Sequence, residues 1–154
     1  MRSRPVRRTR SGQFEIRLSP EERDLLRGLA PRMREVFEDD ADPVRGRLFP
    51  VAYPEDDDRQ TEYRLLVQGE LLDSHLAALA ILEETVDAER LDEDALLGWM
   101  RSLNEVRLVL GVRLEVTEEG AERPTSSDDP RTPAYAVYDY LTWLQGEIIE
   151  ALAR

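Results

Sequence analysis

The spacing of the apolar residues constrains the fold most strongly, because they recur every three or four positions in four stretches of the chain. Such spacing puts apolar side chains on one face of an α-helix, and that face must be buried against another element. The sequence therefore predicts a mostly α-helical bundle of about four main helices. We expect these helices from Ser19 to the acidic group at 38–42, over roughly 59–86, from Asp92 to about 110, and from Thr132 to the C-terminus.

Three of these helices have recognisable starts. Ser19 is an N-cap, Pro20 fits the first helical position, and Glu22 completes a capping box. Asp92 caps the third helix, and Thr132-Pro133 begins the fourth. The fourth helix is apolar around most of its circumference, which is typical of the buried centre of a bundle or of a helix buried against a partner.

Residues 6–18 predict a β-hairpin. Ser11-Gly12 supplies the turn, and apolar residues alternate with polar ones in the strand that follows. The first strand carries arginines, and charge of this kind commonly protects an edge strand from pairing with another sheet. The alternative is contact with nucleic acid, for which the candidates are Arg2, Arg4, Arg7, Arg8 and Arg10.

Three further segments complete a single domain over residues 1–154. Residues 43–54 contain three prolines among apolar residues, which predicts an ordered Pro-rich strap. Residues 117–131 predict an exposed acidic loop, and residues 112–116 fit either a last helical turn or a short strand. The expected division is a basic hairpin at 1–18, a helical core at 19–116, the acidic loop at 117–131 and the C-terminal helix at 132–154.

Composition excludes several kinds of chemistry. The chain has no cysteine and no lysine, which excludes thiolate chemistry, zinc–thiolate sites, Schiff bases and the lysine of phosphate-binding loops. The net charge is −12, and an acidic protein repels a phosphate backbone over most of its surface. No apolar run is long enough to span a bilayer and no signal peptide opens the chain, so we expect no membrane contact and a cytoplasmic location.

No set of residues predicts a catalytic, metal or cofactor site. His75 is the only histidine, and its place beside an apolar stripe indicates a packed, hydrogen-bonded core residue. Asp73-Ser74-His75 contains the residue types of a catalytic triad, but consecutive helical residues point about 100° apart and cannot converge. The acidic clusters at 38–42 and 55–58 lack calcium-loop spacing. Four glycines inside predicted helices suggest close helix–helix approach: Gly28, Gly69, Gly98 and Gly146.

Polar residues interrupt the apolar segment from Trp99 to Leu114. Asn104 and Arg107 stand within it and Glu105 is adjacent, so in a central helix they must be hydrogen-bonded or paired. We favour a polar network that fixes the register of the helices, with a carboxylate from another helix as partner. The alternative is a contact patch for a protein partner.

This segment, WMRSLNEVRLVLGVRLEVTEE, resembles the signature of the actinobacterial AosR-like family of oxidative-stress regulators, formerly a domain of unknown function. FEIRLSPEERDLLRGL, RLFPVAYPEDD and YDYLTWLQGEII are also similar to that family, in the same order. The resemblance implies transcriptional regulation of oxidative-stress and cysteine-related genes together with an extracytoplasmic-function sigma factor. It also implies a disulfide switch, which a chain without cysteine cannot form.

Our leading hypothesis is a regulator of stress-response genes that contacts RNA polymerase or an alternative sigma factor, with weak DNA contact through the N-terminal arginines. The alternative is a non-enzymatic adaptor or scaffold linked to regulated proteolysis or sulfur metabolism. An enzyme is the least favoured reading, because no nucleophile and base are paired in the sequence.

Overall fold

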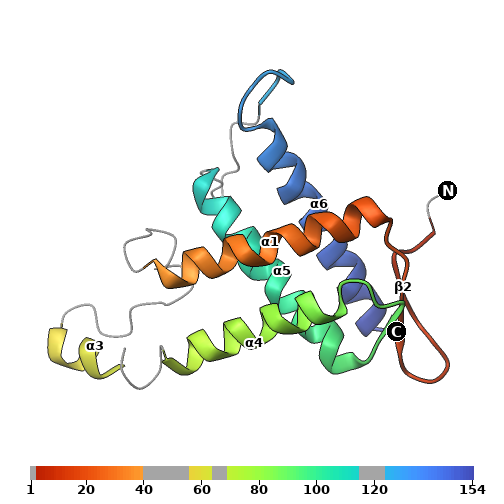
Figure 1. Ribbon diagram of the computed structural model, residues 1–154, viewed down its shortest axis with the longest axis horizontal. Helices are drawn as coiled ribbons and strands as arrows, with labels where there is room; N and C mark the ends of the chain where they lie inside the picture. The colour runs from red at the N-terminus through yellow and green to blue at the C-terminus, as the bar shows by residue number, and fades with distance from the viewer. Residues whose placement is uncertain (1–2, 40–55, 64–68, 115–123) are drawn as a thin grey trace.

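Helix α5 (Glu93–Arg113) lies between α4 (Gly69–Thr85) and α6 (Thr132–Leu152) in this computed structural model. Helix α1 (Pro20–Glu38) packs against α4 and crosses α5 in the view of Figure 1. A short helix, α3 (Asp57–Tyr63), precedes α4. The structure describes residues 3–39, 56–63, 69–114 and 124–154, and within them the chain is mostly α-helical, as predicted. In these same ranges no helix is long and apolar enough to cross a membrane.

Three short antiparallel strands form a sheet at one end of the helices (Figure 1). β1 (Val6–Arg8) pairs with β2 (Phe14–Ile16), and this confirms the predicted hairpin. Gly12 in the turn has a φ of 84°, a conformation that glycine adopts without a side-chain clash. β3 (Arg90–Leu91) pairs with the other edge of β2 and was not predicted, because two residues are too few to show an alternating pattern.

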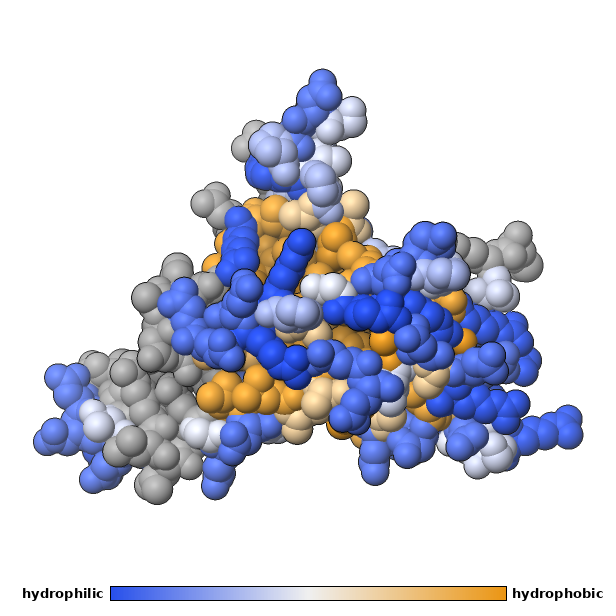
Figure 2. Space-filling view, in the orientation of Figure 1, coloured by the Kyte–Doolittle hydropathy of each residue, from blue (hydrophilic) through white to orange (hydrophobic). Residues whose placement is uncertain are grey.

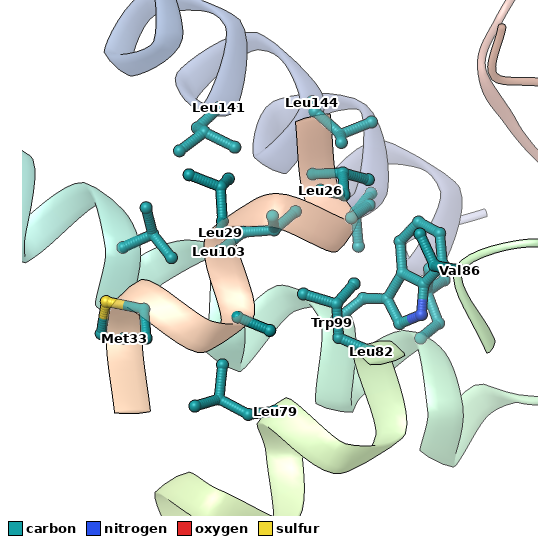
Figure 3. Packing of buried hydrophobic residues seen from close by; sticks show 14 of the residues in the cluster. Leu26, Leu29, Met33, Leu79, Leu82, Val86, Trp99, Leu103, Leu141 and Leu144 are labelled. Carbon is teal, nitrogen blue, oxygen red and sulfur yellow. The ribbon is translucent and has the colours of Figure 1, made fainter. Parts of the chain in front are cut away.

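One hydrophobic core joins the sheet to the helices. Trp99 is fully buried in it, and its indole nitrogen donates a hydrogen bond to Thr85 Oγ1 at 2.7 Å. The sheet contributes Val6, Phe14 and Ile16 from one face. Figure 3 shows how α1, α4, α5 and α6 each supply side chains to this cluster, which Val86 joins just after the end of α4: Leu26, Leu29, Met33, Leu79, Leu82, Trp99, Leu103, Leu141 and Leu144.

The predicted helix starts are present. Ser19 Oγ accepts a hydrogen bond from Glu22 N at 3.1 Å, and Glu22 Oε1 accepts one from Ser19 N at 3.3 Å. Asp92 Oδ1 accepts from Ala95 N at 2.8 Å, which caps α5. Helix α5 continues to Arg113, so residues 112–113 form a last helical turn rather than a strand. Residues 115 and 116 lie outside the described ranges.

Helix α6 is not the centre of the bundle, although this was one of the two expectations from its apolar circumference. The other expectation, burial against a partner, stays a prediction. α5 holds the central place, and α6 exposes a face that carries Ala136, Asp139, Thr142, Gly146 and Glu150. Of the apolar side chains that suggested a central place, Val137, Tyr138 and Trp143 are only half-buried and Ile149 is exposed. An apolar residue in a helical pattern therefore does not by itself require full burial.

The expectation for the helical glycines was right at one position. A Cβ atom on Gly98 would lie 3.0 Å from Ile81 Cγ2, so α4 and α5 approach closely there. A Cβ atom on Gly28, Gly69 or Gly146 would meet nothing within 4 Å, so close approach does not explain these residues.

Two parts of the expected organisation lie outside the described residues. One is the strap at 43–54, and the other is residues 64–68 of the helix expected over 59–86, of which the structure describes α3 and α4. The end of the predicted acidic loop is described, and its residues 125–128 are exposed, as expected.

Candidate functional site

Helix α5 carries polar side chains toward both of its neighbours. On the α6 side, Gln145 forms hydrogen bonds with both Arg107 and Asn104, the polar residues that stand out in the sequence of α5. Arg107 Nη1 donates to Gln145 Oε1 at 2.5 Å, and Gln145 Nε2 donates to Asn104 Oδ1 at 3.4 Å. The Arg107 guanidinium also lies 5.5 Å from the centre of the Tyr138 ring, a cation–π contact. Asn104 is exposed, while Gln145 is buried.

The partner of Arg107 differs from the expected carboxylate. An amide oxygen of Gln145, and not a carboxylate, accepts the hydrogen bond that Arg107 donates to α6. Gln145 was not singled out in the sequence, because a lone glutamine in an apolar helix resembles a solvent-facing residue.

On the α4 side, Glu105 is the centre of a second group. His75 Nδ1 shares a hydrogen bond with Glu105 Oε1, and Arg101 Nε donates to the same oxygen at 3.2 Å. Arg101 Nη1 donates in turn to Ser74 Oγ at 2.5 Å. The side chain of Glu105 is 4% exposed and that of Arg101 is 40% exposed, so the group connects the interior to the surface. The His75 ring stacks on Phe37 of α1, with ring centres 5.3 Å apart.

The structure separates the residue types that suggested a catalytic triad. Ser74 bonds to Arg101 and His75 bonds to Glu105, while Asp73 is exposed on α4. His75 is a packed, hydrogen-bonded residue, as expected from its position. In the described ranges no group of three or more histidine or acidic residues could hold a metal ion.

The N-terminal arginines lie in different surroundings. Arg8 donates to the Leu152 carbonyl near the end of α6 at 3.1 Å and covers the Phe14 ring. Arg4 is 3.9 Å from Glu150 of the same helix, and Arg10 is exposed beside the hairpin turn. The contacts of Arg8 with Leu152 and of Arg4 with Glu150 join the N-terminal segment to α6. Arg2 lies outside the described residues.

Arg7 belongs to a row that crosses the sheet, with Glu15 on β2 opposite Arg7 on β1 and Arg90 on β3. Arg17 Nε donates to Glu15 Oε1 at 2.8 Å, and Arg7 donates to Glu15 Oε2 at 3.3 Å. The hydrogen bond from Arg17, with the positive charges of Arg17, Arg7 and Arg90, holds the pKa of Glu15 below its ordinary value. The sequence reading missed Arg17 and Arg90 because it considered only the first ten residues as a basic segment.

Comparison with known proteins identifies the family of this chain. A family model described as a domain of unknown function, DUF2017, matches residues 3–152. Proteins of Mycobacterium tuberculosis and Mycobacterium bovis named oxidative stress regulator AosR are 29% identical over 185 residues, covering 94% of this chain and 84% of theirs. A Mycobacterium leprae protein named putative oxidative stress regulator AosR is 33% identical over 131 residues, covering 72% of this chain and 58% of its own.

No solved structure matches the chain. The agreement with the family model extends over nearly the whole sequence, from the arginine hairpin to the last turn of α6. The protein therefore belongs to the DUF2017 family and is an AosR-like protein of the actinobacterial type.

Proposed function

We propose that this protein regulates a stress response by binding a protein of the transcription machinery, either RNA polymerase or an alternative sigma factor. The observation that carries the proposal is the similarity, over 94% of the chain, to proteins named oxidative stress regulators. In this proposal the protein works by binding rather than by catalysis, and it acts in the cytoplasm, where the transcription machinery of a bacterium is found.

The regulation we propose uses no cysteine switch. The chain contains no cysteine, so no disulfide can form within it. Its activity then depends on the amount of the protein or on its partner rather than on thiol oxidation. We expect oxidants that act on thiols to leave its binding unchanged.

We place the protein contact on the surface shared by α5 and α6. Tyr135 Oη donates to the Leu114 carbonyl and Gln145 bonds to Asn104, so the two helices run antiparallel with a fixed register. This register puts Ile149 level with Met100, about one helical turn from Leu97.

Leu97 and Ile149 are the exposed large apolar side chains of the described residues, at 40% and 52%. Exposed apolar side chains that lie close together mark surfaces where a protein partner can bury them. Outside this surface, the acidic protein favours a partner whose adjoining surface is basic.

A tagged pull-down from lysate of the native host, with and without nuclease, tests this function. Recovery of polymerase subunits or a sigma factor in both conditions supports it. Recovery of only proteolytic or metabolic components contradicts it and favours the adaptor or scaffold alternative. Repeating the pull-down with an oxidant and with a thiol reductant tests the absence of a cysteine switch.

Two variants on the same helix test the contact surface. Ile149→Asp places a charge at the proposed contact and should reduce recovery of the partner strongly. Ala136→Asp adds the same charge at an exposed position near the other end of α6 and should leave recovery unchanged. Equal recovery with the two variants would contradict the assignment of the surface without contradicting the function.

A further inference from the structure

Helix α5 exposes one stripe of side chains on the side away from the core. Asp94, Leu97 and Arg101 lie on this stripe, because residues three, four and seven apart share one face of a helix. Trp99 of the core stands two residues from both Leu97 and Arg101, so it points to roughly the opposite side. Helix α1 crosses α5 on that opposite side, where Figure 2 shows its mostly hydrophilic outer surface. We call the set Asp94, Leu97 and Arg101 the α5 stripe.

The α5 stripe carries opposite charges on the two sides of its apolar residue. Asp94 is exposed about one turn before Leu97, and the side chain of Arg101 is 40% exposed about one turn after it. Arg101 donates through Nε to Glu105 and through Nη1 to Ser74, and these hydrogen bonds fix its guanidinium group at the surface. The order of an acidic, an apolar and a basic side chain is complementary to the same order in reverse.

The neighbouring part of α6 allows another molecule to approach closely. Ile149 is 52% exposed, and a Cβ atom on Gly146 one turn earlier would meet nothing within 4 Å. Arg154 donates to Glu150 at 3.4 Å, so these two charges beside Ile149 offset each other. The exposed apolar side chains are therefore bordered by charges of both signs, which a purely acidic or purely basic surface would not match.

We propose that a second copy of this chain covers the α5 stripe in the free protein, with the two copies of α5 crossing antiparallel at Leu97. A two-fold axis at this point places Leu97 against Leu97 of the other copy. The same axis brings Asp94 of each copy opposite Arg101 of the other, so every charge pair forms twice. Ile149 of each copy adds apolar surface at the edge of the contact.

The dimer should be weak and reversible. Leu97 and Ile149 are few apolar anchors for a permanent interface, and exposed ion pairs contribute little each. Each copy also has a net charge of −12, whose repulsion is largely screened beyond about 8 Å at physiological ionic strength. The stripe belongs to the surface on which we place the transcription partner, so a second copy and that partner would exclude each other. The self-association itself does not rest on the proposed function.

Sedimentation velocity of the full chain at physiological ionic strength, over roughly a hundredfold range of concentration, tests the proposal. The parent protein should change from monomer to dimer as its concentration rises. Leu97→Asp removes the central apolar contact and should raise the Kd about tenfold. Asp94→Arg places like charges opposite each other twice in each dimer and should raise the Kd about fivefold. The control Glu38→Arg makes the same charge change at an exposed position in the last turn of α1 and should leave the Kd unchanged.

The absence of cysteine allows a direct test of the two-fold arrangement. Leu97→Cys places one thiol of each copy beside the axis, so oxidation should join the copies through a disulfide, which requires Cα atoms within about 7 Å. Asp94→Cys places the two thiols on opposite sides of the crossing, about 10 Å apart along the helices, and should not cross-link with itself. A mixture of Asp94→Cys and Arg101→Cys should cross-link, because these positions face each other. Circular dichroism of each variant confirms that it is folded.

A parent protein that stays monomeric over this range, or equal Kd values for Asp94→Arg and Glu38→Arg, would overturn the proposal. So would cross-linking of Asp94→Cys with itself as fast as that of Leu97→Cys, which would indicate parallel helices. These assays contain this chain alone. Their failure is therefore distinct from failure of the proposed function, which the pull-down of RNA polymerase or a sigma factor tests.

Discussion

His75 of α4 shares a hydrogen bond with Glu105 of α5 in the interior of the helical layer, where both side chains are almost fully buried. An ionisable pair in this position is costly to desolvate and is stable only while each group keeps its partner. Arg101 donates to the same carboxylate oxygen and extends the pair to the surface. The hydrogen bond between His75 and Glu105 therefore fixes α4 against α5, and Arg101 links this buried bond to the surface.

Glu105→Ala should lower the free energy of unfolding by about 1–3 kcal/mol, because it removes the buried acceptor that His75 and Arg101 share. Urea denaturation followed by circular dichroism measures this loss. The control Asp73→Ala removes an exposed carboxylate on α4 and should change stability by less than about 0.5 kcal/mol.

The double variant His75→Phe/Glu105→Leu separates the cost of a broken pair from the value of the pair itself. It removes both polar groups and leaves an apolar contact beside Phe37, so it should be less destabilised than Glu105→Ala. If the double variant is the less stable of the two, the polar group contributes more than apolar packing could at this site.

Two glycines should respond in opposite ways to alanine. Gly98→Ala should destabilise the protein by about 1–2 kcal/mol, because the new methyl group would press on Ile81 Cγ2 and Cβ, which α4 holds in place. Gly28→Ala has open space around it and should stabilise the protein by roughly 0.5–1 kcal/mol through helix propensity. Thermal denaturation of the two variants gives the comparison. A gain from Gly98→Ala would show that α4 and α5 can separate at little cost.

The parts of the fold that could be predicted from sequence are those set by local chemistry. Ser19 and Glu22 define the start of α1 because their hydrogen bonds join residues three apart, and Gly12 defines the hairpin turn through its own backbone. The central place of α5 could not be predicted, because it depends on which faces meet after folding. β3 could not be predicted either, since it acquires strand geometry from its pairing with β2. A single domain over residues 1–154 stays a prediction.

The candidate sites could be predicted only in part, because their arrangement also depends on which elements meet after folding. Asn104, Glu105 and Arg107 stand out because polar residues in an apolar helix need partners, but the sequence does not show that they face two different helices. Arg7 and Arg90 are far apart in sequence and come into one row only when both strands pair with β2. Whether these residues bind a partner or DNA stays a prediction.

The cap of α1 also connects to α6. Tyr140 Oη donates to Glu22 Oε2 at 2.7 Å, while Oε1 of the same carboxylate serves the capping box. Ser19→Ala should therefore cost about 1 kcal/mol of stability, and Ser19→Asp should retain most of the parent value because aspartate also caps helices. Urea denaturation distinguishes them, with Ser127→Ala in the exposed loop as a control expected to have no effect. Equal losses from both Ser19 variants would contradict a capping role.

The titration of Glu15 should report its contacts with Arg7, Arg17 and Arg90 on the sheet. Its pKa lies below the ordinary value because Arg17 donates a hydrogen bond to the charged carboxylate and because Arg17, Arg7 and Arg90 are positive. A carboxyl whose pKa is lowered by folding adds stability above its unfolded pKa, and this stability is lost as the pH falls through the lower, folded pKa. Carboxyl-carbon NMR follows the titration directly, and Arg17→Ala should raise the pKa of Glu15 because it removes the largest cause of the shift. Arg7→Ala should raise it less, since Arg7 acts on the opposite oxygen at a longer distance. If Arg7→Ala shifts the pKa of Glu15 more than Arg17→Ala does, the charges across the strands, and not the hydrogen bond along β2, hold the carboxylate in its ionised form.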